Sequence, residues 1–366
     1  MSTSYGIFAA VTPGLEAALA AELAEVLPDV RHRIMRGGVE LRGPREVLWT
    51  VCARSRLAET VRVRLGRFPA HNFAELEAGL RRMPWVAYLA RDAAVTVQVT
   101  ARKSALYHSG AIADRVASVL ERPLTPPDGD GVRLWVRMVK DRATLSVDAG
   151  GGLMHRRGWR RSVGPAPLRE TLAAACVRLA DLAPEQPLWD PFCGSGTIPI
   201  EAALIASEAL AQPGRRHAFQ GWPTHEEAAY SAWQSGSPAA RATGRRVLGT
   251  DLEADAIAGA TANAERAGAT ACSTWLVGDF EAHIDAIPQG AAVVTNTPYG
   301  KRLAGGGALQ RLFTRFGHVL SSRSDLGPVL ALVGARGFEA ATGLPWETVA
   351  EFSNRGTPTR LLRLVR

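Results

Sequence analysis

Three aspartates and one Asn-x-Pro-Tyr segment in the second half of the chain each follow a short apolar run. They are Asp190, Asp251 in Val247–Leu252 (VLGTDL), Asp279 in Leu276–Phe280 (LVGDF), and the segment Ala291–Gly300 (AAVVTNTPYG). A carboxylate at a strand end can accept both hydroxyls of a ribose, which fits Asp251, and Asp279 is placed where it could accept an adenine amino group. Each acid alone is as readily a helix cap or a solvated loop residue. Four polar strand ends in this order are hard to explain by capping.

The segment Pro187–Thr197 (PLWDPFCGSGT) predicts the turn that organises these strand ends. An apolar run reaches Asp190, and Gly194 and Gly196 then turn the chain into an apolar helix pattern over Ile198–Ala206. This order is the first unit of a doubly wound parallel sheet, whose ligand binds outside the carboxyl ends of the strands. The turn alone is a weak signal, because many glycine turns only join a strand to a helix. No Lys-Ser/Thr pair follows the last glycine, which excludes a P-loop.

The order DPFCGSGT, TDL, GDF and NTPYG resembles the class I S-adenosylmethionine-dependent methyltransferases that modify exocyclic amino groups. Further segments are similar to the bacterial THUMP-domain RNA guanine-N2 methyltransferases: Ser104–Val116 (SALYHSGAIADRV), Leu153–Arg160 (LMHRRGWR), Ala166–Ala175 (APLRETLAAA) and DPFCGSGTIPIEAALIA. The similarity extends over most of the chain. It implies an α/β fold, in which a Rossmann-like class I methyltransferase domain with a doubly wound sheet follows α+β ferredoxin-like and THUMP modules.

The resemblance implies S-adenosyl-L-methionine as the cofactor, bound by the glycine turn, the acidic strand ends and the helix before the first strand. The implied cofactor residues are Asp190, Phe192, Gly194, Ser195, Gly196, Thr197, Asp251, Leu252, Asp279, Phe280 and Thr171. Cys193 lies inside the glycine turn and not in the segment NTPYG, which would face the target base. We therefore expect its side chain to pack in the core and not to act as a nucleophile.

The implied catalytic motif is Asn296, Thr297, Pro298 and Tyr299. The Asn296 side-chain oxygen and the Thr297 carbonyl would accept the two N–H groups of the target amine, and Tyr299 would stack on its base. Thr297 stands where the family's Asn/Asp-Pro-Pro-Tyr/Phe motif has its first proline, so the carbonyl acceptor remains but the fixed φ of proline is lost. We expect activity to be retained with a slightly different target pocket; loss of activity is the alternative.

Cations near aromatic rings are the candidate RNA contacts, because cations bind phosphates and rings stack on bases. The candidates are Arg102, Lys103, Tyr107, His108, Arg156, Arg157, Arg160, Lys301 and Arg302. The resemblance to a THUMP domain implies that the first four contact phosphates and bases near an RNA end. The alternative for Tyr107 and His108 is a structural role, in which they only pack against neighbours and cap a helix. Arg156, Arg157 and Arg160 surround Trp159 in the sequence and could bind an RNA backbone. The alternative is that this stretch is a flexible hinge whose charges are only solvated. The last two could neutralise a phosphate beside the target nucleotide; otherwise they are ordinary exposed cations.

The positive charge of the chain is concentrated in its front part. Residues through Leu168 include 25 Lys and Arg and 16 Asp and Glu, a net charge of +9. The remaining residues include 18 Lys and Arg and 19 Asp and Glu, a net charge of −1, so the total is +8. We therefore expect the RNA partner to bind the front part, although a basic half can also be merely a solvated surface.

Composition also indicates the cellular compartment of the protein and whether it binds a metal or a membrane. Four cysteines without a CxxC pair predict reduced thiols and no metal site, which favours the cytoplasm. The chain has no stretch of about 18 consecutive apolar residues, so we expect no membrane span. The first residues, MSTSYGIFAAVTPG, do not read as a signal peptide. The oligomeric state is left open.

Hydrophobic periodicity predicts the elements and the domain boundaries. The expected strands are Tyr5–Ala10, Gly38–Leu41, Glu59–Phe68, Ala94–Thr100, Val132–Lys140, Arg142–Asp148, Val329–Val333 and Arg360–Val365, beside the four described above. The expected helices are Leu15–Leu27, Pro44–Ala53, Phe73–Met83, Ser104–Leu120, Arg169–Leu182, Ala254–Ala267 and Leu309–Leu320. The expected domains are residues 1–68 (ferredoxin-like), 69–150 (THUMP), 151–167 (basic linker) and 168–366 (methyltransferase), with a surface insertion beside the active site at about 207–246.

These patterns favour methylation of a guanosine N2 amine in structured RNA, with 23S ribosomal RNA slightly ahead of tRNA. A DNA adenine-N6 methyltransferase shares the amine motif but would need a DNA-reading element. A non-catalytic RNA-binding protein with a decayed methyltransferase domain is a further alternative, suggested only by Thr297. A nicotinamide oxidoreductase is disfavoured, because the acid expected about 20 residues after the glycine turn is not reached on a strand until Asp251.

Overall fold

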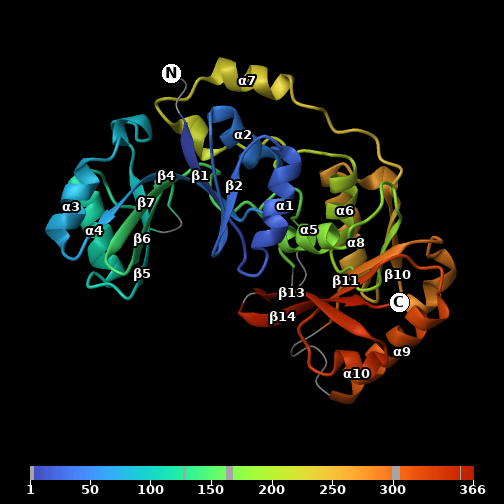
Figure 1. The fold of residues 1–366 in the computed structure, drawn as a ribbon. Helices are drawn as coiled ribbons and strands as arrows, with labels where there is room; N and C mark the ends of the chain where they lie inside the picture. Colours follow the sequence, from blue (N-terminus) through green and yellow to red (C-terminus); the bar gives the residue numbers. More distant parts are fainter. Residues whose placement is uncertain (1–3, 127–128, 162–167, 299–305, 355) are drawn as a thin grey trace. The chain divides into compact units, whose positions relative to one another are not determined.

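Two seven-stranded sheets organise the chain (Figure 1). The computed structural model describes residues 4–126, 129–161, 168–298, 306–354 and 356–366. One sheet belongs to an N-terminal unit made of the residues up to Ala10, Leu23–Met154 and Gly214–Ser237. The other belongs to a C-terminal unit made of Val11–Glu22, His155–Pro213 and Pro238–Arg366. None of the described helices is long and apolar enough to cross a membrane.

The sheet of the N-terminal unit is continuous across its ferredoxin-like and THUMP-like halves. Its strand order is β2-β3-β1-β4-β7-β6-β5, and only the β5–β6 pair is parallel. The strands are β1 (Tyr5–Ala10), β2 (His32–Met35), β3 (Gly38–Gly43), β4 (Thr60–Pro69), β5 (Val95–Arg102), β6 (Val132–Val139) and β7 (Arg142–Asp148). Because β4 pairs with β1 on one side and β7 on the other, it joins the two halves.

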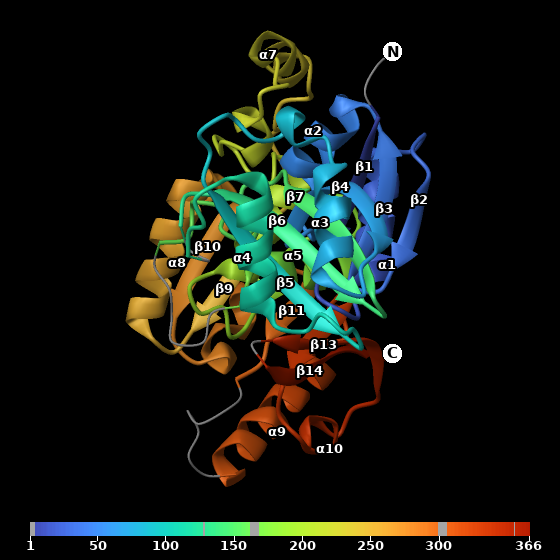
Figure 2. The same cartoon turned by 90° about the vertical axis from the view of Figure 1, so that its left-hand side faces the viewer.

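Alternation along these strands separates a buried face from a polar face. Val61 and Val63 on β4, and Leu134 and Val136 on β6, point into the core, where all four are almost fully buried. The helices of this unit are α2 (Arg45–Arg54), α3 (Phe73–Arg81), the short η1 (Trp85–Ala87) and α4 (Ser109–Leu120), and α1 (Glu16–Val26) begins in the C-terminal unit. In both views α3 and α4 cover one side of β5–β7 (Figures 1 and 2).

The segment Gly214–Ser237, here called the strap, packs against α2 through aromatic rings. It contains η2 (Ala218–Gly221) and α7 (Glu227–Ser235). Trp49 of α2 lies 5.3 Å from Tyr230 and 5.7 Å from Trp233 between ring centroids. The insertion expected at about 207–246 therefore contains a segment that belongs to the N-terminal unit, because burial of its aromatic side chains holds it there.

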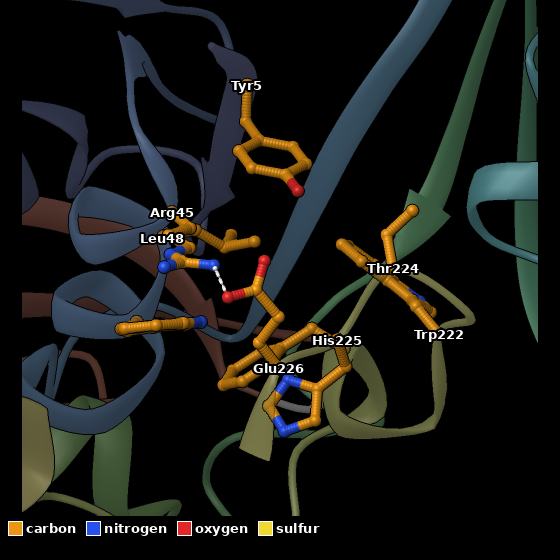
Figure 3. Close-up of a pocket in the computed structure, with 9 residues that line it drawn as sticks. Tyr5, Arg45, Leu48, Trp222, Thr224, His225 and Glu226 are labelled. Carbon is orange, nitrogen blue, oxygen red and sulfur yellow. Dashed lines mark ion pairs between the residues drawn. The ribbon is translucent and has the colours of Figure 1, made fainter. Parts of the chain in front are cut away.

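A small pocket remains between the strap and α2. Tyr5, Trp222 and His225 are among its lining residues (Figure 3). An ion pair between Arg45 and Glu226, 2.8 Å apart and drawn as a dashed line, joins the two segments across it. The ion pair and the rings therefore fasten the strap to α2 with both polar and apolar contacts.

The sheet of the C-terminal unit places the four predicted strand ends side by side. Its order is β10-β9-β8-β11-β12-β14-β13; β10 through β12 are parallel, while β14 is antiparallel to both β12 and β13. The strands are β8 (Leu188–Asp190), β9 (Val247–Asp251), β10 (Ser273–Val277), β11 (Ala292–Asn296), β12 (Val329–Val333), β13 (Trp346–Asn354) and β14 (Thr357–Leu364). Since parallel strands end at the same edge, the predicted polar residues share one edge of the sheet.

Helices cover both faces of this sheet, as expected for a doubly wound fold. They are α5 (Glu170–Leu179), α6 (Thr197–Ala206), α8 (Ala254–Ala267), α9 (Gly306–Ser322) and α10 (Phe338–Thr342), with the short turns η3 (Thr270–Cys272) and η4 (Phe280–Ala286). Phe313 and Phe316 of α9 pack with Trp189 and Val293 in the core of one face. On the other face α6 and α8 approach each other at the glycine turn, where Gly196 lies beside Ala260.

Two predicted elements differ clearly from the structure in their bounds, and two strands were not predicted. Helix α4 begins at Ser109 and not at Ser104, because the residues before it bond to Asp141, whose Oδ1 accepts the Ala105 N–H at 2.7 Å. Strand β10 is Ser273–Val277, so the predicted strand Leu276–Phe280 is wrong in register and Asp279 lies two residues past its end. The exposed edge strand β2 and the strand β13 were not expected, since neither shows a clear apolar alternation.

Candidate active site

The predicted cofactor turn joins β8 to α6 in a conformation that requires glycine. Gly194 and Gly196 have φ angles of 53° and 80°. A Cβ at Gly196 would meet the ring of Trp275 at 2.7 Å, so this position has both a conformational and a steric need for glycine. Ser195 and Thr197 are buried beside it. The N-terminal turn of α6 thus lies at the edge where the strands end, which is where a ligand binds in this fold.

Asp190 is buried at the end of β8 and connects this strand to β11. Its Oδ1 accepts hydrogen bonds from the Thr295 hydroxyl at 2.6 Å and from the Phe192 N–H at 3.2 Å. Burial raises the pKa of the Asp190 carboxyl to about 7, against the two hydrogen bonds, and the nearby Asp251 carboxylate raises it further. A cationic ligand beside Asp190 would favour its charged form.

Asp251 ends β9 and fixes the glycine turn from the neighbouring strand. Its Oδ2 accepts the Gly194 N–H at 2.8 Å, and its Oδ1 accepts the Glu253 N–H at 3.1 Å. Each carboxylate oxygen has further lone pairs, so the predicted contact with ribose hydroxyls remains compatible with these bonds. The next residue, Leu252, is 64% exposed although it is apolar, which suits contact with the flat face of an adenine.

Asp279 and Phe280 follow β10, and their contacts modify the predicted roles. Asp279 Oδ1 accepts the Glu281 N–H at 3.0 Å and pairs with Arg315 of α9 at 2.6 Å. An adenine amino group would therefore share this carboxylate with a guanidinium, which the sequence did not predict. The Phe280 ring is buried against Phe192 and Phe316, so only its main chain is available to a ligand.

Asn296 ends β11 with a buried side-chain oxygen that accepts no hydrogen bond from the described residues. The next residue, Thr297, is fully buried, and both its N–H and its hydroxyl donate to the Leu332 carbonyl of β12 at 3.0 Å. These two bonds anchor a position at which the family motif has proline, which has no N–H to donate. Pro298 follows, while Tyr299, Lys301 and Arg302 lie outside the described residues.

Thr171 lies in the first turn of α5, buried, with a hydroxyl that has no hydrogen-bond partner among the described residues. A buried polar atom without a partner costs free energy unless a ligand or water satisfies it. Thr171 and Asn296 are two such atoms in the C-terminal unit. The Thr171 hydroxyl and the carboxylates of Asp190 and Asp251 suit a ligand that carries both a positive charge and hydrogen-bonding groups, as S-adenosyl-L-methionine does, and the Asn296 oxygen remains for a donor on a second ligand.

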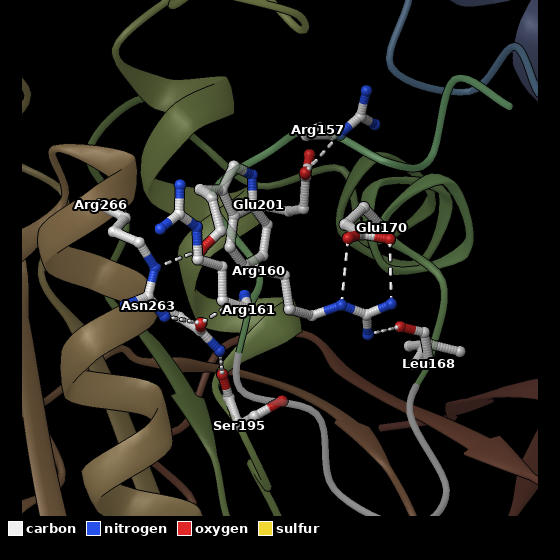
Figure 4. Close-up of polar contacts among 10 residues, drawn as sticks. Arg157, Arg160, Arg161, Leu168, Glu170, Ser195, Glu201, Asn263 and Arg266 are labelled. Carbon is white, nitrogen blue, oxygen red and sulfur yellow. Dashed lines mark hydrogen bonds and ion pairs between the residues drawn. The ribbon is translucent and has the colours of Figure 1, made fainter. Parts of the chain in front are cut away.

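The linker arginines form internal ion pairs, which corrects the prediction that Arg157 and Arg160 contact RNA (Figure 4). Arg157 Nε lies 2.7 Å from Glu201 Oε1, and both side chains are fully buried. Arg160 Nε lies 3.0 Å from Glu170 Oε1, with both side chains at least nine-tenths buried. The charges face carboxylates of α6 and α5 because a guanidinium can be buried only with its charge compensated. Of the predicted linker contacts, Arg156 alone is exposed.

Trp159 and Asn263 complete this network around the glycine turn. Trp159 is buried and its carbonyl accepts a hydrogen bond from Arg266 at 2.8 Å. Asn263 of α8 donates to the Ser195 carbonyl at 3.0 Å and accepts the Arg161 N–H at 3.2 Å, as Figure 4 shows. Glu201 and Asn263 were not among the residues predicted from the sequence. A single acid inside the apolar helix TIPIEAALIA was the available signal for a buried ion pair.

The four predicted THUMP contacts lie together at the end of β5 and the start of α4. Arg102, Lys103, Tyr107 and His108 are all exposed, Tyr107 to 66%. The Tyr107 and His108 rings are 4.1 Å apart between centroids. His108 is the N-cap residue of α4 and makes no side-chain cap bond, so the capping alternative is wrong for it. Among the described residues, no group of three potential ligands could hold a metal ion.

The parallel strand order, the glycine turn and the acidic strand ends define a class I methyltransferase domain preceded by an α+β unit. Three family models match the chain: the RlmL ferredoxin-like domain over residues 6–62, the THUMP domain over 70–148, and the RMKL-like methyltransferase domain over 157–357. The chain therefore belongs to the family of RMKL-like methyltransferases, and its cofactor is S-adenosyl-L-methionine. The fold class and the family expected from the sequence are confirmed.

Solved structures with the same fold cover almost the whole chain. SMU.472, assigned as a methyltransferase and solved with SAH, is 24% identical, with a TM-score of 0.86 over 99% of this chain and 98% of that one. A Listeria monocytogenes protein, predicted to be an N6-adenine-specific DNA methylase, is 28% identical, with a TM-score of 0.82 over 99% and 96%. TrmN from Thermus thermophilus is 21% identical, with a TM-score of 0.75 over 100% of both chains.

Replacement Asp190→Asn should remove a pH dependence from the stability of the ligand-free protein. The folded-state pKa of about 7 lies above the ordinary value of 3.8, so this carboxyl favours folding fully below about pH 3.8 and loses its contribution as pH rises to about 7. We expect wild-type stability to fall relative to the variant over this range, by at most roughly 1.4 kcal/mol per pH unit. Urea unfolding of both proteins at several pH values measures this. A pH-independent difference would contradict it.

Replacement Arg157→Ala should destabilise the C-terminal unit far more than removal of an exposed ion pair. It deprives the buried Glu201 carboxylate of its guanidinium partner, which costs about 3–5 kcal/mol for such pairs. The matched control is Arg241→Ala, since Arg241 pairs with Glu208 at 2.5 Å with side chains 67% and 50% exposed. For that pair we expect less than about 1 kcal/mol. Equal losses in thermal or urea unfolding would show that Arg157 is not a structural cation.

Proposed function

We propose that this protein methylates the exocyclic N2 amine of a guanosine in structured RNA, with 23S ribosomal RNA ahead of tRNA as the substrate. The observation that carries the proposal is the Asn296 side-chain oxygen, which is buried and has no donor among the described residues. It ends β11, the strand next to β8 and its glycine turn. A target N–H would supply the missing donor.

The motif residues act by positioning the amine. Its lone pair is delocalised into the guanine ring, so the free amine is a poor nucleophile. Donation of its two N–H groups to the Asn296 oxygen and the Thr297 carbonyl favours a pyramidal nitrogen, and the bonds to Leu332 hold Thr297 in place. When bound, S-adenosyl-L-methionine would supply an activated methyl group: the N–C bond would form as the sulfonium C–S bond breaks, leaving S-adenosylhomocysteine, and the amine would lose one proton to solvent. The remaining barrier is lowered by holding the reacting atoms about 3–3.5 Å apart.

RNA is favoured over DNA by the domain that precedes the methyltransferase. The THUMP match at residues 70–148 coincides with the basic front part of the chain. The similar Listeria protein is predicted to act on DNA adenine, and that activity uses the same class of amine. The presence of a THUMP domain, a module that binds RNA, makes RNA the better proposal for this chain.

Replacement Asn296→Ala should abolish turnover and leave cofactor affinity nearly unchanged. The variant removes the acceptor for the target amine but none of the residues on β8, β9 or β10 that we assign to the cofactor. Tritiated methyl transfer to RNA measures the first effect, and isothermal titration with S-adenosyl-L-methionine measures the second. Wild-type transfer by Asn296→Ala would refute the role of Asn296. A wild-type protein that does not bind the cofactor would indicate a decayed domain.

Nucleoside mass spectrometry identifies the substrate. We expect a deletion strain to lose one N2-methylguanosine from 23S ribosomal RNA, and purified protein to restore it in extracted RNA. Loss from tRNA would replace ribosomal RNA by tRNA in the proposal. Loss of N6-methyladenine from DNA, with both RNA pools unchanged, would refute RNA guanine as the target.

A further inference from the structure

One face of the N-terminal sheet carries a cluster of arginines. The opposite face is covered by helices, since a Cβ at Gly79 of α3 would meet the ring of Phe68, a buried residue of β4. The neighbouring residue Arg67 consequently points the other way. We call the side of the sheet that includes Arg67 the arginine face; over β4–β7 its arginines are Arg62, Arg64 and Arg67 on β4, Arg133 and Arg137 on β6, Arg102 on β5 and Arg142 on β7.

Strand register places these side chains in rows across the sheet. Thr100, Arg137, Thr144 and Arg67 pair in one row across β5, β6, β7 and β4. Arg137 and Arg67 are exposed, and two strand spacings, about 10 Å, separate their backbones. Arg102, already predicted to contact RNA, lies on the same face two residues beyond Thr100. The exposed row therefore extends the predicted contact region across the sheet.

The next two rows of the same face, which contain Arg64 and then Arg62 on β4, hold their guanidinium groups against aromatic rings. The Arg62 guanidinium stacks 3.4 Å from the centroid of the Trp135 ring. Arg64 donates to the Ser146 hydroxyl at 3.3 Å and lies over the Phe8 ring at 4.2 Å. These contacts hold the guanidinium groups on the sheet surface with little conformational freedom, so that less entropy is lost when they bind a partner.

The arginine face has more positive charge than its own acids neutralise. Burial and then repulsion by Arg64 lower the pKa of Arg62 to about 10. The pKa of Arg64 is also lowered, by burial and by repulsion from Arg137 and Arg67, while attraction to Glu40 raises it. The Asp148 carboxyl, the buried acid of this face, has its pKa raised by burial. An anionic partner that spans several arginines would relieve this repulsion.

We propose that the arginine face binds the phosphate backbone of the RNA substrate, with Arg67 and Arg137 as direct phosphate contacts. Guanidinium groups bind phosphates through paired N–H donors, and a row of them follows a chain of phosphates better than a single carboxylate. This sheet surface, with Trp135 in the row of Arg64, resembles in chemistry the sheets on which proteins bind single-stranded RNA. The inference rests on the proposed RNA substrate and extends its contacts beyond the THUMP residues predicted from the sequence.

Charge reversal at single positions tests this with the full-length protein. Arg67→Glu and Arg137→Glu change the proposed contacts, and Arg82→Glu is the matched control. Arg82 is an exposed arginine of the same unit at the end of α3, the helix that covers the opposite face. The probe is a fluorescein-labelled RNA hairpin with a single-stranded 3′ tail, titrated by anisotropy at several salt concentrations, with a DNA hairpin of the same sequence beside it.

We expect each face variant to weaken RNA binding about tenfold and to lower the salt dependence by roughly 0.7 per lost phosphate contact. Arg82→Glu should change affinity less than about twofold. Unchanged melting temperature and cofactor titration confirm that the variants are folded. Equal weakening by all three variants, or by none, would overturn the proposal, and so would DNA binding of equal strength and equal sensitivity.

Methyl transfer separates this inference from the proposed function. With the RNA substrate, the face variants should raise KM and retain kcat, because the arginine face holds RNA and takes no part in the reaction. A wild-type protein that binds the RNA hairpin through Arg67 and Arg137 but methylates no guanine would refute the proposed function alone. A wild-type protein that methylates guanine, with face variants of unchanged KM, would refute the arginine face alone.

Discussion

The hydrogen bond from the Thr295 hydroxyl to the buried Asp190 carboxylate, 2.6 Å long, connects β8 and its glycine turn to β11, the strand that ends in Asn296. On the other side of β8, the Asp251 carboxylate accepts the Gly194 N–H and connects the turn to β9. Three neighbouring strand ends are therefore fixed to one another by two carboxylates. Group transfer depends on such fixed geometry, because small displacements of the reacting atoms strongly lower the rate.

The arginines of this chain serve two physical roles that composition does not distinguish. Arg157 and Arg160 are buried beside Glu201 and Glu170, and they hold the linker against the helices of the C-terminal unit. Arg67 and Arg137 remain exposed on a sheet without enough acids to neutralise them. Two of the four cations in the run RRGWRR, Arg157 and Arg160, are therefore structural, whereas dispersed arginines that alternate along strands form the basic surface.

The sequence predicts the catalytic sheet well because its strands are apolar and end in polar residues. β12 and α8 have the predicted bounds, and the four polar segments do fall on adjacent strands. The tertiary contacts were harder to predict from the sequence. The ion pair of Arg157 needs a partner 44 residues away, and the strap is fixed by rings on a distant helix. β2 is exposed along its whole length, so burial left no pattern in its sequence. Polar strand ends are local signals, whereas buried ion pairs depend on the whole fold.

The strap also affects how the protein can fold while it is being made. Trp49 of α2 packs against Phe219 and Tyr230, which leave the ribosome some 170 residues later. At the usual rate of translation this delay is on the order of ten seconds or more. During that time the aromatic surface of α2 lacks its native cover, and the methyltransferase strand β8 with its glycine turn has already been synthesised. The N-terminal unit therefore reaches its final packing only after synthesis of the C-terminal unit has begun.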